Sequence, residues 1–454
     1  MKSRILAILL AVVVAVFLAV GCTDKTKDNP TRPIVAEHGV PFLNPSSFYS
    51  IFFSTAHDPG YMPSLAYTPP GYSWSGGGGP RYPVLYLLAP FRSDERYYFE
   101  HGLAQVADRL LAEGKIEPMI IVSIDGRSLW GGSFFANSVA QGRYFTALVK
   151  DTAFDITLYV NPDNFTGPER GPKTLYSPGL VPRIDGTSMS TLPGYLTIAE
   201  PGARGISGVG CGGYGAFAAA LKTDLFGSVS AINAPLDFDG ANGDGGFAAL
   251  LQDAKRTWWD SIVVTGTRVD TLFAFDTSLT DPMRSLIVSA AAAFSPHYTS
   301  VSVDSVYDDQ FGSQTWAFKP VDSLTTDMST YLRRHKVHVP IDSLGNVNSL
   351  IWQKWMDNNI ENIYTNDPAA YASNFKDIKK LLVKSDQAEY RFGEQMDGFI
   401  AFLDDIGDTN HTVMEFTGNS RLTGTSDHFL YDILEDILIF HSQAFQEYLN
   451  PGKK

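Results

Sequence analysis

The sequence is short of cysteine, which limits its covalent chemistry. Cys22 and Cys211 are its two cysteines. If Cys22 is acylated, as argued below, Cys211 has no partner within the chain and no internal disulfide can form. A lone thiol in an oxidising compartment is usually buried and inert, which argues against a reactive Cys211.

Positive charge is also scarce. The chain has 35 Lys and Arg residues against 49 Asp and Glu residues, for a net charge of −14, and no basic stripe is visible. An acidic surface repels phosphate backbones. The composition therefore argues against nucleic acid as a partner.

An apolar run of membrane-spanning length is missing as well. Lys2 and Arg4 precede an apolar stretch, residues 5–20, that falls short of the roughly 20 residues needed to cross a bilayer. This pattern predicts a secretory signal peptide over residues 1–21. Because Cys22 follows small residues at the cut, we expect it to become a lipidated N-terminus. The expected product is an exported bacterial lipoprotein of the cell envelope, with the membrane as a partner.

The rest of the chain divides into a tether and one large domain. Residues 22–35 are polar and predict a flexible tether. Residues 36–450 supply a large core, because 44% of the chain is apolar and 13% aromatic. Two stretches are too long for ordinary connections, about 151–180 and about 239–372. We expect the first to be an insertion and the second a partly helical cap.

Short apolar runs alternate with helical patterns along this domain. Strands are expected at 64–68, 83–88, 119–124, 204–207, 228–233, 381–385 and 412–416. Helices are expected at 103–113, 214–222, 392–403 and 429–445. Strands that are apolar throughout are buried on both faces, so the pattern predicts an α/β fold with a mainly parallel sheet flanked by helices.

Several phrases together resemble a known family. "YTPPGY" (67–72), "YPVLYLL" (82–88) and "LFGSVSAINAPLDF" (225–238) are similar, in this order, to the esterase-D-like branch of the α/β-hydrolases. The resemblance implies the α/β-hydrolase fold with a long cap insertion. It also implies hydrolysis of carboxylic esters by a serine, histidine and aspartate triad, with no cofactor.

The nucleophile's position departs from the family pattern. The family has Gly-x-Ser-Met-Gly-Gly where this chain has "GVGCGG" (208–213), so Gly210 takes the place of the serine. Cys211 takes the place of the methionine, where a buried soft hydrophobe is expected. A one-residue slip of the turn would instead present the Cys211 thiol as a nucleophile. Ser207 is a further alternative.

The oxyanion loop departs too. The family's strand ends in Leu-His-Gly, whereas this one ends in Leu88-Ala89-Pro90, and proline has no N–H to donate. The backbone amides of Phe91 and Cys211 remain as candidate oxyanion donors.

The acid and the base are replaced at the corresponding positions. The family's aspartate falls on Ala388, and its histidine falls on Thr425. Asp386 or Glu389 would serve as a displaced acid, and His428 as a displaced base. Because nucleophile, base and acid work as a unit, four coincident substitutions are the expected trace of lost catalysis.

A metal site is not expected. The stretch "DFDGANGDGG" (237–246) offers Asp237, Asp239, Asn242 and Asp244 as oxygen ligands for calcium. Its spacing does not match an EF-hand loop, since Ala241 stands where a ligand should be. Gly- and Asp-rich turns are common without metals.

Two histidines and three tryptophans are further candidates for functional residues. His335 and His338 lie in a run of basic residues that predicts a solvated loop. Trp130, Trp352 and Trp355 are the aromatic residues that we expect along a cleft, where they would suit sugars or aryl groups.

The sequence thus predicts a lipid-anchored, esterase-like protein that has lost its triad and binds a ligand through the inherited cleft. A glycan, an acyl ester and a protein remain open as the ligand. Two alternatives also remain. One is an active ester hydrolase using Cys211 or Ser207 with His428. The other is a structural surface lipoprotein.

Overall fold

The computed structural model divides the chain into two compact units, Met1–Gly39 and Val40–Lys454. All described residues belong to the second unit. They are 47–54, 61–72, 80–128, 130–138, 141–149, 181, 196–240, 246–258, 272–274, 282–297, 336–341, 347–388, 392–420 and 427–452. The predicted signal peptide, the tether and the 151–180 insertion lie outside these ranges. Within them, no helix combines the length and hydropathy that crossing a bilayer requires.

An eight-stranded, mostly parallel sheet organises the second unit. Its strands lie in the order β1–β2–β4–β3–β7–β8–β12–β13. Strand β2 pairs antiparallel with both of its neighbours, β1 and β4, and every other pair in this sheet is parallel. The bounds are β1 Ser47–Ser54, β2 Tyr61–Thr68, β3 Val84–Leu88, β4 Ile120–Ile124, β7 Arg204–Val209, β8 Ser228–Ile232, β12 Lys379–Ala388 and β13 His411–Ser420.

The predicted α/β architecture is confirmed, and within the eight-stranded sheet one strand was not expected. All seven expected strands lie within a few residues of their predicted bounds. Every residue of β3 and β4 is buried, as expected for parallel strands covered on both faces. The unexpected strand is β1, which has the aromatic-rich sequence SFYSIFFS, lies at the edge of the sheet and, among the described strands, pairs with β2 alone.

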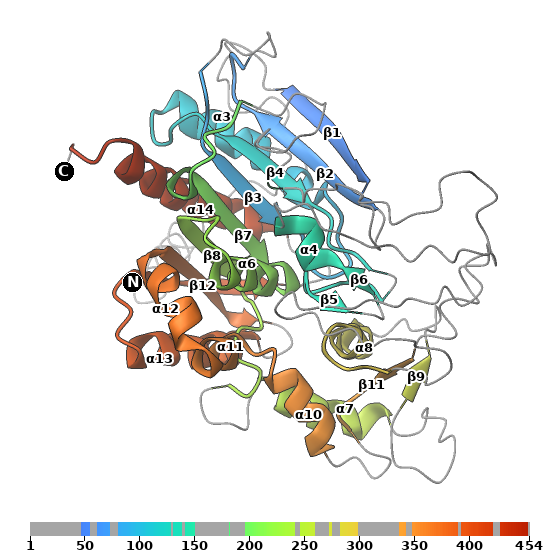
Figure 1. Cartoon of the computed structure of the whole chain (residues 1–454). Helices are drawn as coiled ribbons and strands as arrows, with labels where there is room; N and C mark the ends of the chain where they lie inside the picture. The colour runs from blue at the N-terminus through green and yellow to red at the C-terminus, as the bar shows by residue number, and fades with distance from the viewer. Residues whose placement is uncertain are drawn as a thin grey trace, which may run out of the picture. The chain divides into compact units, whose positions relative to one another are not determined.

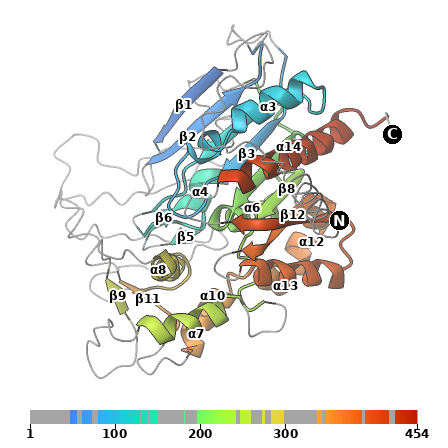
Figure 2. The ribbon, with the colours of Figure 1, turned by 180° about the vertical axis from the view of Figure 1, so that it is seen from behind.

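Helices cover both faces of the sheet. Helix α6 (Cys211–Lys222) lies against β3, β7 and β8 on the face nearer the viewer in Figure 1. Helices α3 (Leu103–Ala112) and α14 (Asp427–Leu449) lie together on the opposite face, which Figure 2 brings to the front. Because α6 is rich in alanine and glycine, it packs closely on the strands, and all its residues through Leu221 are buried.

We call the interval between β8 and β12 the insertion, and it includes the residues for which the sequence predicts a cap. Figure 1 shows α7, α8, α10 and β11 gathered beyond the arrowheads of the central strands. The described elements are α7 Gly246–Trp258, β9 Leu272–Ala274, α8 Pro282–Phe294, β10 Pro296–His297, β11 Lys336–His338, α10 Ser349–Met356, α11 Ile360–Asn366 and α12 Pro368–Asp377.

The prediction of a solvated loop around His338 is wrong. His338 ends β11, the middle strand of a small sheet with β10 and β9, and is only 8% exposed. Its carbonyl oxygen accepts a hydrogen bond from Ser295 Oγ, at 2.5 Å, and Ser295 Oγ in turn accepts one from the indole of Trp355, at 2.8 Å. The charged neighbours of His338 in sequence concealed a core position.

A buried histidine links α14 to the centre of the sheet. His441 is fully buried, with Nδ1 2.7 Å from Ser228 Oγ and Nε2 2.9 Å from Ser230 Oγ. A side chain on Gly205 would reach within 2.5 Å of His441 Nδ1, so glycine makes room for the ring. A neutral imidazole has one donor and one acceptor nitrogen, and both are satisfied here. Burial lowers the pKa of His441 to about 3.

This histidine predicts a pH-dependent stability. A folded-state pKa below the unfolded value means that unfolding takes up a proton between about pH 6.5 and about pH 3, so stability is lost as pH falls. Over that range we expect His441 to lower the unfolding free energy by up to ~1.4 kcal/mol per pH unit. Urea unfolding of the wild type and of His441→Gln at several pH values, with each unfolding free energy expressed relative to its value at pH 8, measures the contribution of His441. Equal slopes in the two proteins would contradict it.

Candidate functional site

A sharp turn connects β7 to α6 at Gly210. Its backbone angles are φ 54° and ψ −119°, a conformation that residues with a side chain rarely adopt. Gly210 N–H donates to Ile232 O at 2.9 Å, and Gly210 O accepts from Tyr214 N–H at 3.1 Å. This is the strand-turn-helix geometry of a nucleophile elbow, and with the mostly parallel sheet it establishes the α/β-hydrolase fold.

Three glycines allow the chain to bend this sharply. A Cβ on Gly208 would lie 2.2 Å from the carbonyl carbon of Gly212, and one on Gly212 would lie 2.2 Å from Leu88 O. A Cβ on Gly213 would lie 2.6 Å from the Cβ of Ala234. Helix α6 therefore starts in backbone contact with the ends of β3 and β7. The glycines on either side of position 210 permit this close contact and so allow the sharp turn of the elbow.

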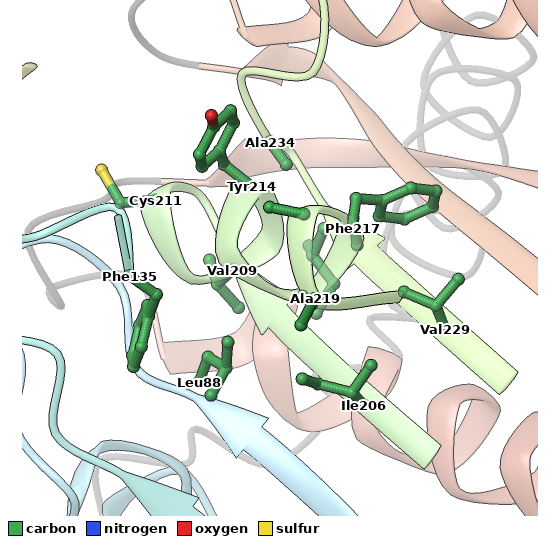
Figure 3. Packing of buried hydrophobic residues seen from close by; sticks show 14 of the residues in the cluster. Leu88, Phe135, Ile206, Val209, Cys211, Tyr214, Phe217, Ala219, Val229 and Ala234 are labelled. Atoms are coloured by element: carbon green, nitrogen blue, oxygen red, sulfur yellow. The ribbon is translucent and has the colours of Figure 1, made fainter. Parts of the chain in front are cut away.

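Cys211 is the first residue of α6 and is only 2% exposed. Figure 3 shows its thiol at the start of the helix, in the buried cluster that includes Leu88, Phe135 and Tyr214. Burial raises the pKa of Cys211 well above its ordinary value. A thiol in this setting stays protonated, and the protonated form is a poor nucleophile.

Ser207 is also placed inside the protein. It lies in β7 with no exposed surface, and its Oγ accepts a hydrogen bond from Ser230 Oγ at 2.7 Å. Ser230 in turn contacts His441, so a serine and a histidine do meet in this structure. They do so within the sheet's core, where a substrate carbonyl has no room to approach.

The loop after β3 is held by its backbone. Ala89 N–H donates to Ile124 O at 3.0 Å and Arg92 N–H to Gly131 O at 2.9 Å, while the N–H of Phe91 has no partner among the described residues. Arg92 has a positive φ of 64° and donates to Ser285 Oγ of α8 at 2.5 Å. The insertion thus holds the loop that carries the candidate oxyanion donor Phe91.

The candidate acid positions lie at the carboxyl end of β12. The pairing of β12 with β13 shifts register between Ser385 and Gln387, which leaves Asp386 at an irregularity, and Ala388 ends the strand. Register shifts near active sites often redirect a side chain. Asn233 fixes this end of β12, because its Oδ1 accepts from Ser385 N–H at 2.8 Å. Glu389 lies outside the described residues.

The base position is described only by its backbone. His428 is the second residue of α14, and Thr425 lies outside the described residues. The structure therefore sets His428 at the start of a helix, and its catalytic role stays a prediction.

An aromatic cluster joins the insertion to α6. The ring of Tyr214 lies 5.8 Å from Phe238 and 5.4 Å from Phe294, and Phe294 lies 6.1 Å from Trp355. Trp355 has no exposed surface. The expectation that Trp355 lines an open cleft is therefore wrong, because it fills the core between α10 and α8. Trp130 is also buried, at 5% exposure.

Carboxyl groups gather where the insertion leaves and rejoins the sheet. Asp237 is buried and accepts from Asn359 Nδ2 at 3.1 Å, and Asp239 lies near the Trp352 indole. Burial, with the neighbouring Asp237 charge, raises the pKa of Asp239 to about 6. Burial, with the charges of Asp237 and Asp239, also raises the pKa of Glu361.

The described residues do not include a set of side chains that would bind calcium. Asn242 and Asp244 lie outside the described residues, and within the described ranges no group of three or more His, Cys, Asp and Glu side chains is arranged to hold a metal. Sequence reasoning noticed Asp237 and Asp239 but missed Glu361, which α11 brings in from more than 120 residues away.

Burial of Cys211 predicts an unreactive thiol. In a Cys22→Ser variant, where Cys211 is the sole cysteine, we expect Ellman's reagent to release less than about a tenth of the stoichiometric chromophore from the folded protein. After unfolding in guanidinium chloride the same protein should react with one thiol per chain. Rapid stoichiometric labelling of the folded protein would show that the thiol is accessible.

No known protein-family profile matches the chain. Among solved structures, it is similar to a ferulic acid esterase, with 13% identity over 88% of this chain and 98% of that one, at a TM-score of 0.44. It is also similar to a fluorophosphonate-binding serine hydrolase of Staphylococcus aureus, with 12% identity over 87% and 99%, at 0.44. An S-formylglutathione hydrolase from Agrobacterium tumefaciens has 11% identity over 88% and 96%, at 0.42.

Proposed function

We propose that this protein is an exported lipoprotein whose esterase-like α/β-hydrolase domain binds a ligand at the elbow without hydrolysing it. The observation that carries the proposal is Gly210, which occupies the strained tip of an intact elbow and offers no attacking group. Glycine accepts such dihedrals at little cost, whereas a side chain there costs on the order of 1–3 kcal/mol.

Neighbouring groups do not replace the lost nucleophile. The Cys211 thiol is buried with a raised pKa, and Ser207 is bonded inside the core. General-base catalysis needs a base within hydrogen-bond reach of the proton that it removes. His441 contacts serines that are fully buried, and burial holds its pKa at about 3.

The backbone of the elbow supports binding in place of catalysis. The first N–H groups of a helix have no helical acceptor and lie at the positive end of its dipole. In α6 these belong to Cys211, Gly212 and Gly213. They suit the carbonyl or carboxylate oxygen of an acyl compound, so among a glycan, an acyl ester and a protein ligand we favour the acyl compound.

Export and membrane attachment belong to the same proposal. The signal-like residues 1–21 and the cysteine directly after them support a lipidated Cys22, and residues 22–35 would let the domain stand off the membrane surface. The proposed location is the bacterial cell envelope.

The proposal predicts that the purified protein does not turn over simple esters. We expect wild type, Cys211→Ala and His428→Ala to hydrolyse p-nitrophenyl butyrate at the same rate, indistinguishable from the rate without protein. Steady-state release of p-nitrophenol measures this.

The unhydrolysed ester also tests the binding half of the proposal. At saturating concentration it should raise Tm by a few degrees, since a ligand that binds only the folded state stabilises it by mass action. A wild-type rate well above background that both alanine variants abolish would favour the active hydrolase instead. Background rates with no Tm shift would favour a purely structural role.

Lipidation of Cys22 predicts a membrane-bound product. Expressed in a bacterium with a lipoprotein export pathway, the wild type should partition into the detergent phase of Triton X-114, and Cys22→Ser into the aqueous phase. A Cys211→Ser variant is the matched control and should partition like the wild type. Equal partitioning of the wild type and Cys22→Ser would exclude an anchor at this residue.

A further inference from the structure

The insertion is attached to the sheet at two adjoining segments. The chain leaves β8 through residues 233–240 and returns through α10 and α11. Asn359, directly before α11, joins the two segments, because its Oδ1 accepts from Phe238 N–H at 3.3 Å and its Nδ2 donates to Asp237 Oδ1 at 3.1 Å. Tyr214 of α6 donates to Asn358 O at 2.7 Å. The base of the insertion is therefore hydrogen-bonded to a side chain of α6 that lies one helical turn after the elbow.

Three carboxyl groups share this base, which we call the carboxylate clasp: Asp237 and Asp239 on the outgoing segment and Glu361 on α11. Among the described residues, the charged groups that act on them are the clasp members themselves and Asp405, at the end of α13 (Phe392–Asp405). Two neutral groups also lie against them, the Asn359 amide at Asp237 and the Trp352 indole of α10 at Asp239. Within the described ranges no lysine or arginine forms an ion pair with the clasp.

We propose that the carboxylate clasp is a pH-dependent attachment, which holds the returning segment α10–α11 on the sheet in mildly acidic surroundings and loosens it near neutrality. Like charges within one partly buried cluster repel one another, and among the described residues no lysine or arginine pairs with the clasp to offset its ionisation. Protonation removes this repulsion while the Asn359 bridge between the two segments remains.

The direction of the effect follows from the pKa values. Burial is the first cause for all three carboxyl groups, and each pKa is raised, that of Asp239 to about 6. A raised carboxyl pKa stabilises the attached state at low pH, and this contribution is lost as pH rises through about 6. If detachment returns Asp239 to water, its opening equilibrium rises about tenfold between pH 5 and pH 7.5.

Trp352 and Tyr214 connect this attachment to the elbow. Trp352 lies 5.9 Å from Trp355, which belongs to the aromatic cluster over Tyr214. Loosening of α10 would therefore disturb the packing above α6 and give a ligand access at neutral pH. That consequence rests on the proposed function, whereas the clasp itself does not.

Hydrogen exchange tests the clasp on the full-length protein. Protection factors for residues 349–366, corrected for intrinsic exchange at each pH, should fall about tenfold from pH 5 to pH 7.5 in the wild type. Protection in β3 and β7 should not change by more than about twofold. Asp239→Asn should reduce the pH dependence of residues 349–366 severalfold and keep this segment protected at pH 7.5.

Two further variants make the result decisive. Glu361→Gln removes a clasp charge from the other segment and should act in the same direction, so the test stands even if Asp239→Asn folds poorly. Asp357→Asn changes an exposed carboxylate of the same region that bonds to Gln353, and should keep the full pH dependence. Protection of 349–366 that does not vary with pH in the wild type, or varies equally in all four proteins, would overturn the proposal. Neither result involves ester hydrolysis, so failure of the clasp and failure of the proposed function are distinguishable.

Discussion

The close approach of α6 to the ends of β3 and β7 is the constraint on which the rest of the site depends. Gly208, Gly212 and Gly213 leave no room for a side chain between helix and strands, so the chain must turn abruptly at Gly210. The turn fixes where the helix N-terminus points and which residue occupies its tip. With glycine at the tip, the strand and helix keep the geometry of a hydrolase elbow, and position 210 carries no side chain.

The insertion depends on the same turn. Tyr214 lies one turn into α6, and its ring packs against aromatic side chains of the insertion. Its hydroxyl donates a hydrogen bond to Asn358 O in the returning segment. Arg92, beyond the candidate oxyanion donor, is bonded to α8. The insertion thus contacts both parts of the candidate binding site, namely helix α6 and the loop after β3. For this reason, the attachment of the insertion at the carboxylate clasp would affect access to the elbow.

Sequence reasoning recovered the layers of the fold better than the details of the site. Buried parallel strands carry a continuous apolar signal, and seven were placed; β1, at the edge, lacks both that signal and regular alternation. His441 continues the four-residue spacing of Ile433 and Ile437 in α14, so a core histidine was foreseeable. Glu361 was not, because only tertiary folding brings α11 beside Asp237. The bond by which Asn233 holds the end of β12 was not foreseeable either, because Asn233 adopts a positive φ of 42° that the sequence does not reveal.

Binding without hydrolysis requires that no side chain near the elbow forms a covalent bond with an acyl group. Intact-mass measurement of the folded protein after incubation with an excess of p-nitrophenyl acetate tests this requirement most directly, because it detects an acyl-enzyme even when turnover is slow. We expect an unchanged mass, or only slow labelling of surface lysines. A single rapid acetylation that peptide mapping assigns to residues 207–211 would contradict it.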